Sequence, residues 1–165
     1  SACSAPTTYQ SAFSEQNQIK GNSESISAPM DATWGSVLEV MATRGWLIQQ
    51  ADTKSHLILA HREMRDKDDQ DLSHTITATV TLVPTTDQMT QVIAAANMTT
   101  ELHKKSYTWW HLLWLIPIFP TGTEYTTVVV NRDTVHDPQL YHDFFAAVQK
   151  RCDEKKRLLS PVPVS

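Results

Sequence analysis

The side chains that could support chemistry in this 165-residue chain are seven histidines, an acidic cluster and two cysteines. No two histidines stand four residues apart with a glutamate between them, the arrangement typical of a zinc protease. No closely spaced cysteine pair offers a zinc site either. We therefore expect no metal and no cofactor, and interpret the histidines as ordinary surface or half-buried residues. They are His56, His61, His74, His103, His111, His136 and His142.

The acidic cluster lies in the segment DKDDQD, which places four aspartates in residues 66–71. Carboxylates at such spacing can bind calcium. The glycine and the final glutamate of an EF-hand loop are absent, however, and Arg65 and Lys67 offset part of the negative charge. This pattern favours a solvated hairpin loop over a calcium site.

Motifs for covalent or phosphate chemistry are also missing from the sequence. There is no Gly-x-Ser-x-Gly nucleophile motif, and Gly122 stands alone rather than in a phosphate-binding loop. We therefore predict that the protein is not an enzyme. A periplasmic hydrolase remains the weakest alternative, because convergent active sites leave no sequence motif.

The two cysteines differ in kind. Cys3 follows Ser1 and Ala2, and a bacterial lipoprotein signal ends in small residues before its acylated cysteine. Cys152 falls on the apolar stripe of an expected helix, where a free thiol behaves as a small buried hydrophobe. We therefore expect Cys3 to carry a lipid. The alternatives are an ordinary signal-peptide remnant, or a disulfide between the two cysteines in an oxidising compartment.

Composition limits the classes of partner. The formal net charge is -4, with acids and bases interspersed, so the sequence shows no nucleic-acid footprint. No apolar run reaches the roughly 18 residues that a membrane-crossing helix needs. A lipid on Cys3 would instead hold the protein at the periplasmic face of an outer membrane.

The most apolar stretch is WWHLLWLIPIFPTG, residues 109–122. Three interpretations remain open: a core or lid segment, a loop that contacts the membrane through its tryptophans, and a partner surface. In a variant of the first, the segment gates an apolar cavity. Alternation along a strand turns half of such residues outward, so we predict that a tryptophan of this stretch is exposed. The candidate membrane or partner contacts are Trp109, Trp110, Leu113, Trp114, Ile116 and Phe119.

Hydrophobic periodicity predicts two helices. The first is capped by Asp31, carries Trp34, Val37, Leu38 and Met41 on one face, and ends at Gly45. The second begins with Asp137 as cap and Pro138 as first helical residue. This helix runs to Arg157, and its apolar stripe consists of Tyr141, Phe144, Phe145, Val148 and Cys152.

Six segments read as strands. Residues 25–29 suggest a short edge strand that ends at Pro29. The others follow from WLIQQAD, SHLILAHREM, HTITATVTLVP, MTQVIAAANMTTELHKK and TEYTTVVVNRDTV, although the alanines of MTQVIAAANMTTELHKK leave a helix as the alternative there. In the fourth segment along the chain, alternate residues Ile76, Ala78, Val80 and Leu82 are apolar, so the intervening side chains face the other way. They form a candidate partner-facing row of Thr75, Thr77, Thr79 and Thr81.

These elements predict an α+β fold, an antiparallel sheet of about five or six strands with two helices on one face. Residues 1–25 are polar and lack periodicity, so we expect a lipidated N-terminal tether. Residues 26–157 would form a single domain, and residues 158–165 an extended proline-containing tail.

Two stretches carry a family resemblance. APMDATWGSVLEVMATRGWLIQQADTKSHLILA resembles the start of helix-grip domains in envelope lipoproteins such as BamC. IPIFPTGTEYTTVVVNRDTVHDPQLYHDFFAAVQKRC resembles an uncharacterised family of proteobacterial outer-membrane lipoproteins. Together the resemblances cover roughly residues 26–155, the size of one domain. They imply a helix-grip-like fold and an envelope location, and they assign no catalytic residue.

The sequence thus predicts a non-enzymatic envelope lipoprotein, an accessory or structural component of an outer-membrane or periplasmic protein assembly. The alternative is a periplasmic protein that binds a lipid or another hydrophobic ligand. Such a carrier needs an apolar cavity between sheet and helix, of at least ~300 Å³.

Overall fold

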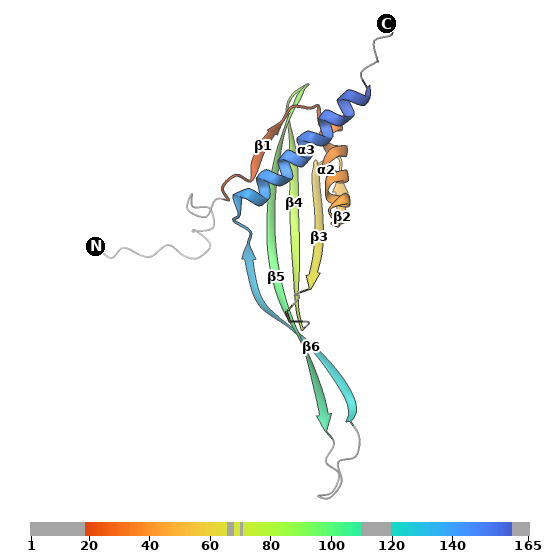
Figure 1. Ribbon diagram of the computed structural model, residues 1–165, viewed down its shortest axis with the longest axis vertical. Coiled ribbons are helices and arrows are strands. Elements are labelled where there is room, and N and C mark those ends of the chain that lie inside the picture. The colour runs from red at the N-terminus through yellow and green to blue at the C-terminus, as the bar shows by residue number, and fades with distance from the viewer. Residues whose placement is uncertain (1–18, 66–67, 70, 110–119, 160–165) are drawn as a thin grey trace, which may run out of the picture.

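The computed structural model describes residues 19–65, 68–69, 71–109 and 120–159, with the backbone alone for 104–109 and 120–125. The fold is α+β, with two helices against one face of a six-stranded antiparallel sheet (Figure 1). This confirms the expected fold class and order of elements. The elements are β1 (Ser23–Ile26), α2 (Met30–Thr43), β2 (Leu47–Asp52), β3 (Leu57–Arg65), β4 (Leu72–Thr86), β5 (Met89–Trp109), β6 (Pro120–Thr134) and α3 (Pro138–Leu159).

Strands β2 to β5 form a consecutive antiparallel meander, so each pairs with its sequence neighbour. The other edge of β5 is shared by two strands. The first of them, β1, pairs with Thr90 to Ile93. The second, β6, pairs with β5 from Asn97 to Trp109. The expected edge strand at 25–29 is therefore shifted, because pairing with β5 begins at Ser23 and ends at Ile26.

Tyr141 of α3 closes the gap between these two partners of β5. Its hydroxyl accepts a hydrogen bond from the Ala96 amide at 3.2 Å and donates one to the Val135 carbonyl at 2.7 Å. The Val135 amide in turn donates to the Ala96 carbonyl. Burial raises the pKa of Tyr141 above its ordinary value. The side chain thus keeps backbone groups paired at a point where the strand ladder is interrupted.

Helix α2 begins two residues earlier than a cap at Asp31 would place it. The N-cap is Pro29, without a side-chain capping bond, and the Thr33 amide donates to the Pro29 carbonyl. The expected role of Asp31 was wrong, since this residue lies inside the first turn, where an acidic side chain suits the helix dipole. The C-terminal end was predicted correctly: Gly45 has a φ of 78° and terminates the helix.

Helix α3 begins at Pro138, as predicted. The Asp137 carboxylate accepts a hydrogen bond from the Gln139 amide at 3.0 Å, which confirms Asp137 as the cap. The helix continues to Leu159, so its last two residues belong to the stretch expected to be an extended tail. At the other end of the domain, β1 reaches back to Ser23 and so overlaps the expected tether. Both domain boundaries are therefore too narrow by two or three residues, a normal error for ends that depend on tertiary hydrogen bonds.

The core lies between the two helices and the sheet. Tyr141, Phe145, Val148 and Cys152 of α3 are all buried, as their spacing predicted. Beneath them the sheet presents alternate buried residues of β3, β4 and β5. Three alanines, Ala60, Ala78 and Ala96, lie side by side across these strands and are all buried beneath the helices. The helices are also joined at their exposed side, where Glu39 bonds Arg151 at 2.6 Å and Lys155 at 3.1 Å.

Cys152 is 1% exposed, which confirms its predicted burial. We expect its thiol to resist an aqueous thiol reagent in the folded protein and to react fully once urea unfolds the chain, because the reagent requires access to the thiolate. The experiment uses the Cys3→Ser variant, in which Cys152 is the only thiol. Rapid labelling without denaturant would contradict the packing of α3 on α2.

Candidate functional site

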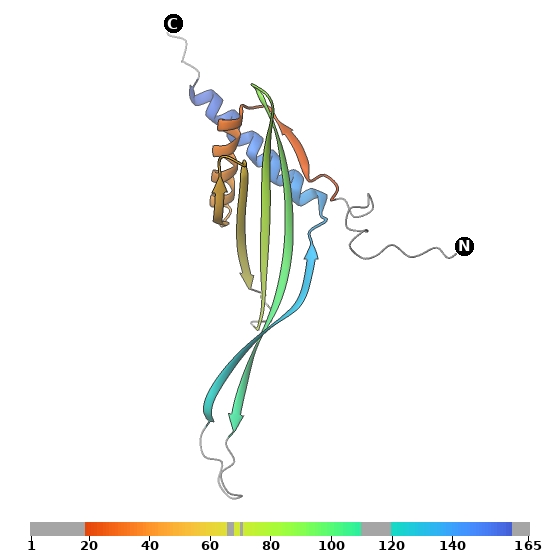
Figure 2. The same ribbon diagram turned by 180° about the vertical axis from the view of Figure 1, so that it is seen from behind.

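The uncovered face of the sheet is the first candidate surface. Ala78, Val80 and Leu82 are buried beneath the helices, so strand alternation turns the threonine row to the opposite side. The described helices all lie on the other side of the sheet (Figure 2). We call this side the open face. The row is half-buried among its neighbours on adjacent strands and confirms the predicted alternation; it consists of Thr75, Thr77, Thr79 and Thr81.

The open face changes character along the threonine row. Beside Thr79 and Thr81 the neighbouring positions are aliphatic, with leucines on β3 and Ala95 and Ile93 on β5. Beside Thr77 and Thr75 they are polar, with His61 on β3 and Asn97 and Thr99 on β5. Polar, hydrogen-bonding chemistry is therefore concentrated at the end of the row nearer to β6.

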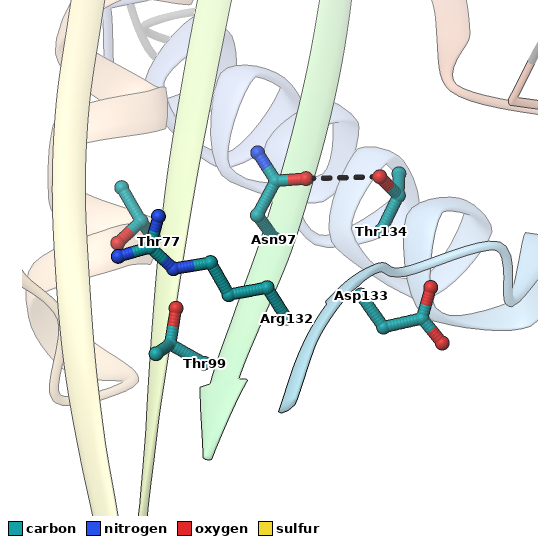
Figure 3. Close-up of a pocket in the computed structure, with 6 residues that line it drawn as sticks. All are labelled: Thr77, Asn97, Thr99, Arg132, Asp133 and Thr134. Atoms are coloured by element: carbon teal, nitrogen blue, oxygen red, sulfur yellow. Dashed lines mark hydrogen bonds between the residues drawn. The ribbon is translucent and has the colours of Figure 1, made fainter. Parts of the chain in front are cut away.

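An open pocket of about 460 Å³ occupies that polar end. It lies where β6 joins the side of β5, and strands β4, β5 and β6 all contribute (Figure 3). The sequence had singled out only one member of its lining, Thr77. The lining residues are Thr77, Asn97, Thr99, Arg132, Asp133 and Thr134.

Arg132 is the charged residue that points into this pocket. Its guanidinium group extends from β6 over β5 and lies between Thr77 and Thr99, whereas Asp133 points away (Figure 3). Pairing of Arg132 with Thr99, and of Thr134 with Asn97, sets these side chains on the open face. The Thr134 hydroxyl donates to the Asn97 side-chain carbonyl at 3.1 Å and fixes that wall of the pocket.

Strand β6 changes register next to the pocket. Thr100 pairs with Asn131 and Glu101 with Val129, so Val130 is an extra, bulged residue. The bulge keeps Arg132 on the same face as Thr99, while β6 curves away below it. Bulges of this kind commonly redirect side chains at functional sites. The sequence carries no local signal for the bulge, because the pattern TTVVVNRDT alternates equally well in either register.

His103 is the first residue of β5 beyond the last pair with β4. Its Nε2 is 2.8 Å from the Ser73 hydroxyl, and its Nδ1 is 3.1 Å from the Thr127 hydroxyl. A serine beside a histidine is the contact that nucleophile activation requires. Here, however, the second partner is a threonine rather than a carboxylate, and the group lies on exposed strand surface outside the pocket. These contacts favour a structural role, in which the His103 side chain links β4, β5 and β6.

The second candidate surface is a two-stranded ribbon. Pairing of β5 with β4 ends at Leu102, but β5 continues with β6 until Trp109 pairs with Pro120. We call this extension the ribbon; it contains 103–109 and 120–127. At about 3.3 Å per residue it extends ~23 Å beyond the last pair with β4. It points away from the helices and the core (Figure 1).

The apolar stretch is attached to the far end of the ribbon. Trp109 is the last residue of β5, and Pro120 begins β6, an edge strand as expected for a proline. The remaining predicted contacts, Trp110, Leu113, Trp114, Ile116 and Phe119, lie outside the described residues, as does Cys3. The expected exposure of a tryptophan stays a prediction.

Where β6 meets the sheet it also has exposed apolar side chains. Val128, Val129 and Val130 are 47%, 45% and 58% exposed. Exposed β-branched residues on an edge strand favour pairing with another chain. This segment was predicted as a strand, but its edge position could be assigned only from the sheet order.

No metal-binding group of three or more His, Cys, Asp or Glu side chains is present within the part of the chain that the structure describes. Asp68 and Asp69 of the acidic loop are described and exposed, and Asp66 is not described. Neither described helix is long and apolar enough to cross a membrane.

No family model matches this chain, and no curated protein matches it. The resemblance to envelope lipoproteins therefore stays a prediction from the quoted sequence stretches. The functional argument rests on the open face, its pocket and the ribbon.

Proposed function

We propose that this protein is a non-enzymatic, lipid-anchored component of a protein assembly at the periplasmic face of an outer membrane, and that the ribbon carries its principal contact. The ribbon is the single observation that supports this proposal best. A two-stranded ribbon is marginally stable in water without further packing. Its continuation beyond the sheet is therefore most easily explained by a surface against which it packs.

The sequence attached to the ribbon suits such a surface. Tryptophan, leucine and isoleucine dominate residues 109–116, and buried aromatic side chains provide much of the binding energy in protein interfaces. Trp109 and Pro120, where the two strands of the ribbon end, lie far from the core. The support for a core or lid role of the apolar stretch is therefore weaker. Partner contact and membrane contact both agree with this position, and we favour the partner.

The proposed lipid on Cys3 is compatible with this arrangement. From Ile93, which pairs with Ser23, to Trp109 the strand spans ~53 Å at about 3.3 Å per residue. Ile19 already packs against the core, so only residues 3–18 can extend, and they bridge at most ~58 Å. An acyl anchor and the end of the ribbon can therefore reach the same membrane-bound assembly simultaneously.

The carrier alternative receives less support from the described interior. A lipid site beneath α3 would need an apolar cavity there, whereas Phe145 and Val148 are completely buried against the sheet. The described pocket lies on the open face and has a polar lining. Organic extraction of the purified protein tests this alternative directly, because a carrier should yield stoichiometric lipid.

The test of the proposal changes Trp109, Trp110 and Trp114 together to serine in the full precursor. We expect the variant to remain in the membrane fraction but to lose co-isolation with its envelope complex, because the acyl anchor is intact and the aromatic contact is gone. Quantitative mass spectrometry of detergent-solubilised complexes measures this loss. The Cys3→Ser variant is the matched control for the anchor, and it should appear in the soluble periplasmic fraction.

Two results would overturn parts of this proposal separately. Unmodified Cys3 in the membrane-extracted wild-type protein would exclude the lipid anchor. Unchanged co-isolation by the triple tryptophan variant would exclude the ribbon contact. If anionic vesicles alone shield these tryptophans from an aqueous quencher, the contact is with the bilayer rather than with a protein.

A further inference from the structure

The pocket on the open face has the chemistry of an anion site. Its lining offers a guanidinium group, the Thr77 and Thr99 hydroxyls and the Asn97 amide as hydrogen-bond donors, while the Thr134 hydroxyl already donates to Asn97. The one carboxylate of the lining, on Asp133, points away from the other side chains (Figure 3). The pocket is therefore rich in donors, and its inward-facing charge is positive.

Arg132 is available to a ligand. No carboxylate of the described residues lies within ion-pair distance of it, in contrast to Arg151, which bonds both Glu39 and Glu154. An exposed arginine without a partner is ordinary on a protein surface. Arg132 differs because its guanidinium lies across a concave surface, between two hydroxyl groups on neighbouring strands. This position leaves its planar fork free for a bidentate contact.

The surrounding charges restrict the ligand further. Glu101 lies two residues beyond Thr99 in β5, and Glu63 of β3 pairs with Thr75 of β4. Both glutamates are therefore on the open face. Both side chains disfavour a ligand with two negative charges. A monoanion therefore fits the site better than a phosphate dianion.

We propose that Arg132, Thr77 and Thr99 form a binding site for the carboxylate of a small hydroxylated acid. The guanidinium donates two hydrogen bonds to the carboxylate through its fork, and the threonine hydroxyls and the Asn97 amide bond the hydroxyl groups of the ligand. The pocket volume of about 460 Å³ is sufficient for a ligand of monosaccharide size. This site does not depend on lipid anchoring or on the ribbon contact.

Four ligands test the proposal in full-length protein: glucuronate, glucose, acetate and inorganic phosphate at constant ionic strength. NMR titration follows the backbone amides of the lining residues and the Asn97 side-chain amide. We expect glucuronate to bind most tightly, with saturable shifts at Thr77, Asn97 and Thr99. Tighter binding of phosphate, or equal binding of glucose, would overturn the assigned ligand class.

Variants test whether Arg132 makes the contact. Arg132→Gln should weaken glucuronate binding about tenfold or more, because a charge-assisted hydrogen bond is lost. Arg132→Lys should recover part of the affinity, since it retains the charge without the fork. Arg62→Gln is the matched control, because Arg62 pairs with Ile76 and so lies on the other face; its affinity should be unchanged.

Thr77→Val provides a second, independent test. It preserves the size of the side chain and removes one donor, so binding should weaken several-fold while the fold is retained. Circular dichroism confirms folding of every variant. Wild-type affinity in both Arg132→Gln and Thr77→Val, or the absence of saturable shifts at these positions, would exclude the site.

Discussion

Phe145→Ala is expected to lower the free energy of unfolding by about 3–5 kcal/mol. Phe145 is 0% exposed and lies in the core cluster between α3 and the sheet. Removing its ring forfeits the transfer of apolar area from water and leaves a cavity that backbone strands cannot collapse to fill. Because single domains are stable by only about 5–15 kcal/mol, this variant should be close to unfolding.

Urea denaturation followed by circular dichroism measures the change. Phe144→Ala is the matched control: its ring packs at the edge of the core, 5.6 Å from that of Phe145, and it is partly exposed. Its loss should cost clearly less than that of Phe145. Equal losses for the two variants would contradict the orientation of α3 on the sheet.

Tyr141→Phe is expected to cost about 1–3 kcal/mol although it removes a single oxygen atom. The change leaves the Ala96 amide and the Val135 carbonyl without the hydroxyl that bonds both. An unsatisfied buried backbone group incurs a desolvation penalty of this size. Thr134→Val is the control, since it removes an exposed hydrogen bond at the same strand junction. It should change stability by no more than about 0.5 kcal/mol.

The same residue predicts a pH dependence. Burial raises the pKa of Tyr141 above 10.0 in the folded state, so the neutral phenol is favoured there. Its contribution to stability is complete below pH 10.0 and is lost as the pH rises through the folded-state pKa. The stability difference between wild type and Tyr141→Phe should therefore shrink in alkaline urea titrations. A constant difference from neutral to alkaline pH would contradict burial of the hydroxyl.

Local periodicity was sufficient to predict the helices and most strands. The stripe from Tyr141 to Cys152 and the alternation about Val80 arise from the geometry of a single element. The same holds for Gly45 and Asp137, which end or begin helices through bonds to their immediate neighbours. Asp31 was assigned wrongly because Pro29 offers a competing helix start that uses only backbone hydrogen bonds.

The candidate site could be predicted only in part. Thr77 was selected because it lies opposite a buried strand face, and that signal is local. Arg132 and Asn97 could have been paired with it only by knowing the register of three strands. The bulge at Val130 also shifts the register of β6 by one residue, and nothing in the sequence of β6 indicates it.

The sequence by itself determined which residues of α3 and β4 face the core, because helix and strand periods are properties of a short chain segment. In α2 it was only partly right, since Thr33, Ser36 and Val40 are buried while Trp34 and Leu38 are only partly so. The tertiary structure alone decided which strands share an edge. Ser23 pairs with Ile93, and Thr134 with Asn97, so the first and the last strand in the chain order complete the same side of β5. These choices depend on hydrogen bonds and burial summed over the whole domain, and no local pattern records them. The ribbon and the Arg132 pocket both result from this shared edge, where β6 joins the sheet beside β5 and then leaves it.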